Sequence, residues 1–209
     1  MIFDGKIWDP TNVLDIIKLR LACWAKSKWP DHNTSITDFI CAPSSAFAPI
    51  SRKQTKSKVS WECPPISWFK FNTDKAARGC PGHLGIGGVL QDETGVVKLT
   101  FSKKAGWGDA NLAKVLAVRE AMVLFVASSW VNSNNIIIES DSKNVVSWIS
   151  NPSKALWRLR QLILQIHSLK NRVAGGWLIK HISRSGNETA DSLAKSRVDR
   201  THDLLRLYP

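Results

Sequence analysis

The sequence lacks the apolar segments that direct a chain into or across a membrane. Its first residues contain no signal-like apolar run, and no apolar stretch reaches transmembrane length. We therefore expect an intracellular protein of the cytoplasm or nucleus, neither secreted nor partnered with a membrane.

Cysteine is scarce, and its spacing excludes a zinc knuckle. The four cysteines are Cys23, Cys41, Cys63 and Cys80. No two of them are spaced as C-x-x-C, and no histidine cluster lies near them in the sequence. Isolated thiols of this kind are typical of a reducing compartment.

Acidic residues are also in the minority. Seventeen aspartates and glutamates face 29 lysines and arginines, which gives a formal net charge of +12 and a pI of about 9.8. Such a surplus favours a polyanionic partner, most simply nucleic acid. The alternative is a basic protein that has no such partner.

The 209 residues and an apolar fraction of 44% allow one well-packed domain and an appendage. Composition changes along the chain and predicts four parts: an N-terminal helical segment at 1–30, a polar basic linker at 31–66, a compact domain at 67–198 and a C-terminal tail at 199–209. The basic run at 51–58 is read as solvated linker, with a phosphate contact or a weak nuclear signal as alternatives.

The compact domain is organised around the stretch from Trp68 to Gly95. Phe69 and Phe71 alternate with polar residues, which is typical of a strand, and this strand ends on Asp74. We expect a glycine-containing bend at 75–83 and two further strands at 86–90 and 96–101, which complete an antiparallel meander. The remaining pattern predicts helices at 111–129, around 145–148, at 156–171 and at 188–197, and strands at 136–138 and 177–182.

Three aspartates occupy corresponding places in this order of elements. Asp74 and Asp141 follow two strands, and Asp191 lies in the first turn of the last helix. Sites in open α/β sheets form at the carboxyl ends of strands. Three converging carboxylates beside a polyanion need a divalent cation, and two Mg²⁺ ions about 4 Å apart can clamp the attacking water and the leaving oxygen of a phosphodiester. The alternative for each aspartate is an ordinary turn or cap residue.

Several motifs together resemble the ribonuclease H-like domain of plant non-LTR retroelement reverse transcriptases and their host relatives. The resemblance covers about Trp68 to Val198. It rests on Phe-Asn-Thr-Asp at 71–74, Gly-Ile-Gly-Gly-Val-Leu at 85–90, Ala-Val-Arg-Glu-Ala at 117–121, Ile-Ile-Glu-Ser-Asp-Ser at 137–142, and the segment from His181 to Asp191.

This resemblance implies an α/β fold with a five-stranded mixed sheet and helices on both faces. It also implies hydrolysis of RNA in RNA–DNA hybrids with Mg²⁺ or Mn²⁺ as cofactor. By motif position Asp74, Asp141 and Asp191 are the family's catalytic, metal-binding aspartates, and His181 has the spacing of a loop histidine that assists catalysis. The alternative for His181 is a strand-end residue.

Contacts to the nucleic acid are expected from residues near this site. Arg78, Arg184 and Asn187 are the candidates for phosphate or sugar contacts. The partner is then an RNA–DNA hybrid or a duplex, and the chain belongs to a larger reverse-transcriptase polyprotein in one interpretation.

One position departs from the family pattern. The family's fourth carboxylate is a glutamate in the helix, and Lys114 stands in its place. Glu120 lies six residues further on and faces another direction, so it is a poor substitute. Lys114 can instead neutralise Asp74 and Asp141, and Lys75 adds positive charge beside the first aspartate. Three hypotheses remain: a hybrid-specific ribonuclease, a nucleic-acid-binding domain without strong metal binding or catalysis, and a decayed retroelement fragment.

Overall fold

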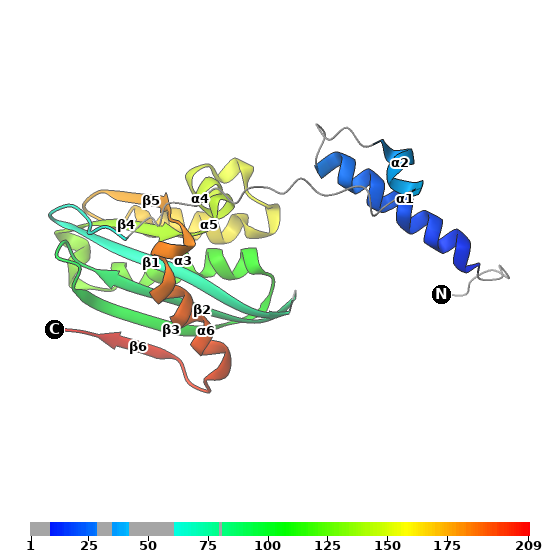
Figure 1. Cartoon of the computed structure of the whole chain (residues 1–209). Coiled ribbons are helices and arrows are strands. Elements are labelled where there is room, and N and C mark those ends of the chain that lie inside the picture. The colour runs from blue at the N-terminus through cyan, green and yellow to red at the C-terminus, as the bar shows by residue number, and fades with distance from the viewer. Residues whose placement is uncertain (1–8, 29–34, 42–60, 80) are drawn as a thin grey trace. The chain divides into compact units, whose positions relative to one another are not determined.

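The structure, a computed structural model, describes residues 9–28, 35–41, 61–79 and 81–209 (Figure 1). The chain divides into two compact units, residues 1–56 and 57–209. The predicted basic run at 51–58 lies outside the described residues. Within the described part, no helix combines the length and the apolarity needed to cross a bilayer.

The described residues of the first unit form the helices α1 (Pro10–Lys28) and α2 (Ile36–Cys41). The carboxylate of Asp9 accepts a hydrogen bond from the Thr11 amide at 2.9 Å and so satisfies one free donor at the start of α1. Helix α2 falls inside the segment predicted as a linker, so that segment contains secondary structure that its polar composition does not suggest.

The second unit is built on one six-stranded mixed sheet with the order β5-β4-β1-β2-β3-β6. Strands β1, β4 and β5 are parallel, whereas β2, β3 and β6 continue the sheet from β1 by antiparallel pairing. The strands are β1 (Trp68–Gly79), β2 (Gly82–Gln91), β3 (Val97–Gly108), β4 (Asn135–Ser140), β5 (Trp177–His181) and β6 (Leu204–Leu207).

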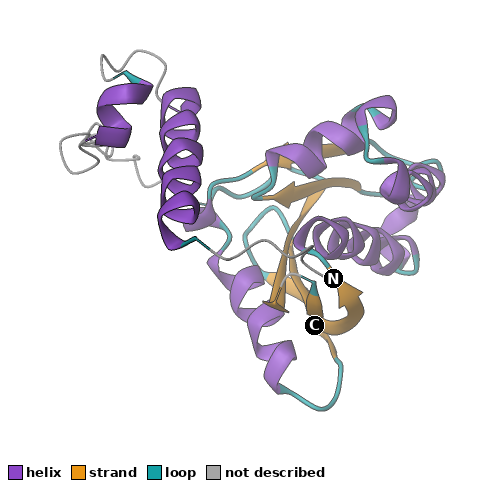
Figure 2. Cartoon of the chain, turned by 90° about the vertical axis from the view of Figure 1, so that its right-hand side faces the viewer, coloured by secondary structure: helices purple, strands orange, loops and turns teal. Residues whose placement is uncertain are grey.

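Helices cover both faces of this sheet (Figure 2). Helix α3 (Ala110–Val126) packs on β1 and β2 and against α5 (Trp157–Lys170), while α6 (Glu188–Asp199) crosses β1, β2 and β3 on the opposite face. The short helix α4 (Lys143–Ser150) follows β4. The described part of this unit also contains the 3₁₀ turns η2 (Ser129–Asn132), η3 (Pro152–Lys154) and η4 (Arg184–Gly186).

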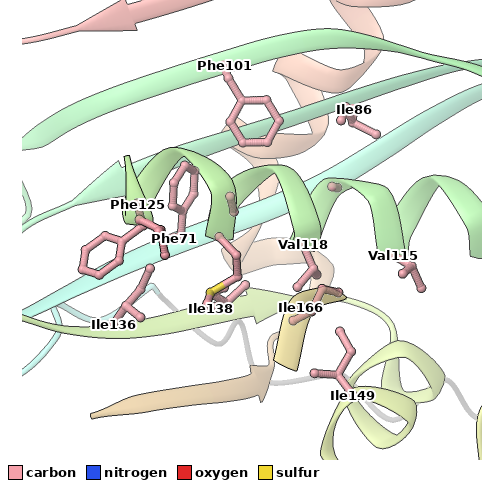
Figure 3. Packing of buried hydrophobic residues seen from close by; sticks show 14 of the residues in the cluster. Phe71, Ile86, Phe101, Val115, Val118, Phe125, Ile136, Ile138, Ile149 and Ile166 are labelled. Carbon is pink, nitrogen blue, oxygen red and sulfur yellow. The ribbon is translucent and has the colours of Figure 1, made fainter. Parts of the chain in front are cut away.

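The main core lies between the sheet and α3 (Figure 3). Phe71 and Phe101 on neighbouring strands meet edge to face with ring centroids 5.6 Å apart, and both are fully buried. Ile136 and Ile138 point toward the same core from β4. The two-residue period of β1 and the β-branched run of β4 thus place their apolar side chains as the sequence indicates.

A buried chain of polar groups lies on the other face of the sheet. Lys70 on β1 and Glu139 on β4 form an ion pair of 3.2 Å, and both residues are less than a tenth exposed. Asn72 donates to Glu139 at 2.9 Å and accepts from the Trp61 indole at 2.8 Å. The Lys70 ammonium also donates to the carbonyl of Glu62 at 2.6 Å. Residues 61 and 62, predicted to lie in the linker, are therefore bound to the domain.

The fold class is confirmed, but the ends of several elements differ from the prediction. Strand β1 continues past Asp74 to Gly79, because its pairing with β2 extends to Gly82. The prediction of a C-terminal tail at 199–209 is wrong in part. Residues Leu204–Leu207 form β6, which pairs with Leu99–Ser102 of β3 and adds a sixth strand to the sheet.

Glycines in β2 let α6 approach the sheet closely. A Cβ atom at Gly87 would lie 2.5 Å from the amide nitrogen of Ala194, and one at Gly85 would lie 2.7 Å from the Ala194 carbonyl oxygen. Any larger residue there would push α6 off the sheet. This close contact fixes the position of Asp191, which α6 carries.

Candidate nucleic-acid interface

The register of β1 and β4 places Asp74 and Asp141 side by side. Thr73 is paired with Ser140 at the end of the parallel ladder, so each aspartate is the next residue of its chain. Carboxyl ends of parallel strands share one edge of the sheet, which is where sites of α/β proteins form. The sequence prediction that these two aspartates converge agrees with this geometry, although Asp74 lies within β1 and not at its end.

Asp191 comes to the same place from the first turn of α6. Asn187, which precedes α6, donates its side-chain amide to the Thr73 carbonyl at 3.0 Å and to Asp74 at 3.2 Å. Asn187 is only 2% exposed. The Lys75 amide also donates to the Asp74 carboxylate, at 2.7 Å. These bonds hold the Asp74 carboxylate in one orientation.

Lys114 enters this group of carboxylates from α3. Its ammonium donates to the Asp141 carboxylate and lies 4.0 Å from an oxygen of Asp74. The side chains of Lys114, Asp74 and Asp141 are 12%, 9% and 5% exposed, so water screens this contact weakly. Lys114 therefore forms ion pairs with both aspartates that the sheet places side by side.

Two further cations reach the aspartates from the rim. The Arg184 guanidinium lies 3.4 Å from Asp141, and the Lys195 ammonium lies 2.5 Å from Asp191. Both side chains are mostly exposed, at 92% and 68%. The cavity that these residues share has a volume of about 530 Å³, and its lining comprises Asp74, Lys75, Ala76, Ala77, Ala110, Lys114, Asp141, Arg184, Asp191 and Lys195. Three carboxylates and four cations give this lining a formal charge of +1.

Burial shapes the titration of the central aspartate. Loss of hydration raises the pKa of Asp74 above its ordinary value, and the charges of Asp141 and Asp191 act in the same direction. The Lys75 amide and the Lys114 ammonium oppose this rise. At the rim, the hydrogen bond to Asp191 raises the pKa of Lys195. The charged state of Asp74 is therefore favoured by the Lys75 amide and the Lys114 ammonium and opposed by burial.

The site does not fit a divalent ion bridging Asp74 and Asp141. A unit charge 4 Å from a divalent ion repels it by roughly 8 kcal/mol at an effective dielectric constant near 20. Lys114 places such a charge on one carboxylate and beside the other. Among the residues that the structure describes, no three histidine, cysteine, aspartate or glutamate side chains form a group that could hold a metal. The predicted metal-binding role of the three aspartates therefore meets a direct electrostatic obstacle.

The other predicted residues are placed differently. His181 ends β5 opposite Ser140, is exposed and is not among the residues that line the cavity. Arg78 is exposed near the end of β1, also outside the lining. Asn187 is buried on Asp74, so its role here is to position that carboxylate and not to present an exposed contact. Only Arg184 of the three predicted nucleic-acid contacts lines the cavity.

Sequence reasoning missed Lys195. The signal that could have found it is its spacing, because Lys195 follows Asp191 by four residues and neighbours of this spacing face each other on a helix. The polar chain from Trp61 to Lys70 was missed as well, because Trp61 was assigned to the linker.

The sheet order, the helices on both faces and the three aspartates at one edge define a ribonuclease H-like domain. Residues 72–197 match the family described as reverse transcriptase-like. The chain belongs to this family, as a ribonuclease H-like domain of the plant retroelement type.

Individual relatives agree with this assignment. A ribonuclease H protein of Arabidopsis thaliana is 29% identical over 148 residues, which are 69% of this chain and 23% of that protein. The chain therefore spans about a quarter of the length of this relative. Ribonuclease H1 of the archaeon Halobacterium salinarum is 25% identical with a TM-score of 0.59, covering 63% of this chain and 98% of the other. The compost-derived LC11 ribonuclease H1, solved in complex with an RNA/DNA hybrid, is 26% identical with a TM-score of 0.58, covering 63% and 96%.

Proposed function

We propose that this domain binds RNA–DNA hybrids or related duplexes at the cavity of Asp74, Asp141 and Asp191, and that hydrolysis is weakened or lost. The observation that carries the proposal is the Lys114 ammonium between Asp141 and Asp74. The net charge of +12 and the hybrid bound by the LC11 relative support a nucleic-acid partner.

Binding requires cations that phosphates can reach. Arg184 and Lys195 have this property, because their charged ends are at the exposed rim while their carboxylate partners lie deeper. An arginine can grip a phosphate with two parallel hydrogen bonds, and a lysine acts as a point charge. Both can turn toward a phosphate at little cost, since exposed ion pairs contribute little stability.

Hydrolysis requires more than positive charge. In two-metal nucleases the ions generate the attacking hydroxide and stabilise the leaving oxygen. The Lys114 ammonium carries one charge and has no open coordination position for a water, so it replaces the charge of such an ion but not its chemistry. Loss of Mg²⁺- or Mn²⁺-dependent activity follows from the substitution, even though the fold is retained.

Two other interpretations differ from this one in measurable ways. An active hybrid ribonuclease would cleave despite Lys114, and a decayed fragment would neither cleave nor bind.

The Arabidopsis relative extends far beyond the matched region, which supports an origin of this domain within a larger reverse-transcriptase polyprotein.

The test measures binding and cleavage of one labelled RNA–DNA hybrid with Mg²⁺ or Mn²⁺ present. The native chain should bind the hybrid and leave the RNA strand intact, and Lys114→Glu should gain metal-dependent cleavage. The variant Lys114→Glu with Asp141→Asn controls for contaminating nuclease and should lose that gain. Cleavage by the native chain that disappears on Asp141→Asn would show that hydrolysis is retained. Absence of any hybrid binding would reject the proposal.

A further inference from the structure

We infer that Lys114 is a resident counterion of this site, so that nucleic-acid binding at the cavity is independent of divalent cations. This inference rests on the proposed function, since it concerns how the same cavity accepts a polyanion. The inference rests on the ion pairs of the three aspartates with cations of the protein. Lys114 pairs with Asp74 and Asp141, and Lys195 pairs with Asp191.

The position of Lys114 is determined by the fold and not by the ligand. Lys114 lies early in α3, whose start is capped by Asp109 accepting from the amides of Asn111 and Leu112 at 2.8 and 3.1 Å. Its neighbours Ala113 and Val115 are fully buried in the core. The fold therefore places the Lys114 backbone beside the carboxylates at any ion concentration, whereas a metal ion would be present only at sufficient concentration.

The sign of the formal charge on the cavity lining decides whether a phosphate is attracted or repelled. With Lys114 the lining carries a formal charge of +1, and without its charge the lining is neutral. Replacement by glutamate makes the formal charge −1, which opposes a polyanion until dissolved cations compensate it. Without Lys114, the remaining cations Lys75, Arg184 and Lys195 only balance the three carboxylates and leave no surplus positive charge.

The experiment measures the dissociation constant of a labelled RNA–DNA hybrid in EDTA and in millimolar Mg²⁺, at one ionic strength. We expect the native chain to give values that agree within about twofold. Lys114→Glu should bind about tenfold more weakly in EDTA and recover in Mg²⁺. Lys114→Gln should fall between the two, and it serves as the milder variant if glutamate disturbs folding.

A matched control separates the cavity from the overall charge. Lys154 is exposed in η3 and away from the cavity lining, so Lys154→Glu changes the net charge by the same amount. This control should lower affinity equally in EDTA and in Mg²⁺. A denaturing gel measures the intact RNA strand in every titration. The Mg²⁺ titration of Lys114→Glu uses a hybrid with a non-hydrolysable RNA strand, because this variant is expected to cleave RNA.

Thermal unfolding without nucleic acid gives an independent readout. Mg²⁺ or Mn²⁺ should leave the Tm of the native chain and of Lys154→Glu unchanged, and should raise that of Lys114→Glu by mass action. Hybrid binding by the native chain only in Mg²⁺ would overturn the inference and leave the proposed function standing. Equal binding of Lys114→Glu in EDTA and Mg²⁺ would also overturn it, whereas no binding under any condition would reject the proposed function itself.

Discussion

The buried ion pair of Lys70 and Glu139 offers the sharpest test of how this domain is stabilised. The two charged groups lie 3.2 Å apart, and their side chains are 8% and 9% exposed. At an effective dielectric constant near 20 their attraction is about 5 kcal/mol, of which desolvation removes a large part. The intact pair therefore contributes little net free energy to stability, whereas burying either charge without its partner is strongly destabilising.

Replacing Lys70 by methionine keeps most of the side-chain volume and leaves Glu139 charged without its partner. Removing one partner of a buried pair typically costs about 3–5 kcal/mol. That is a large part of the roughly 5–15 kcal/mol by which domains are stable. Glu139→Gln removes the opposite charge and retains an acceptor for Asn72, so the double variant lacks both charges and should lose less than the sum of the single variants.

Urea unfolding, followed by far-UV circular dichroism, measures these differences in a double-mutant cycle. We expect a coupling of at least about 1 kcal/mol between residues 70 and 139. A loss below about 1 kcal/mol for Lys70→Met at neutral pH would refute the reasoning, because it would mean that water reaches Glu139 and screens its charge. Additive single effects would refute it as well.

Three further predictions concern the cap of α3, the seat of α6 and the basic surface. Asp109→Ala should lower the free energy of unfolding by about 1 kcal/mol at neutral pH, whereas Asp109→Asn should retain most of the cap. The hydrogen bond from Arg158 lowers the pKa of Asp109 from its ordinary value, so this contribution should be lost as pH falls through that depressed pKa. Urea unfolding of the native chain and of Asp109→Ala at successively lower pH measures this loss, because the difference between them should shrink. Gly87→Ala should cost about 1–3 kcal/mol in urea unfolding, because its Cβ would lie 2.5 Å from the Ala194 amide; a neutral effect would mean that α6 is seated loosely. Hybrid affinity should fall steeply between low and moderate salt through counterion release, and a flat salt profile would mean that the basic surface does not contact phosphates.

Much of the domain could be predicted because its strands and helices have strong periodic patterns. The alternation around Phe69 and Phe71 and the run from Ile136 to Ile138 identify β1 and β4, and the family resemblance aligns Asp74 with Asp141. The contact of Lys114 with both aspartates also follows from its place in the motif, and the structure contains it.

The remaining features depend on tertiary contacts that local sequence does not encode. The stretch from Ala76 to Gly79 has no strand pattern and becomes part of β1 only because β2 pairs with it. Strand β6 has four residues and forms on the edge that β3 offers. Lys70 alternates with apolar neighbours as a surface residue would, yet the Glu62 carbonyl, the Trp61 ring and Glu139 bury it.

The way in which the fold distributes the site has an evolutionary consequence. The aspartates belong to β1, to the end of β4 and to α6, and Lys114 reaches them from α3, an element that supplies none of the three. Exchange at position 114 therefore leaves the carboxylates in their places. Lysine and glutamate codons differ by one base, so a single transition converts a resident cation into a fourth carboxylate, and the reverse transition restores it. Forms of this domain with a lysine and with a glutamate at position 114 are therefore mutational neighbours on one unchanged scaffold.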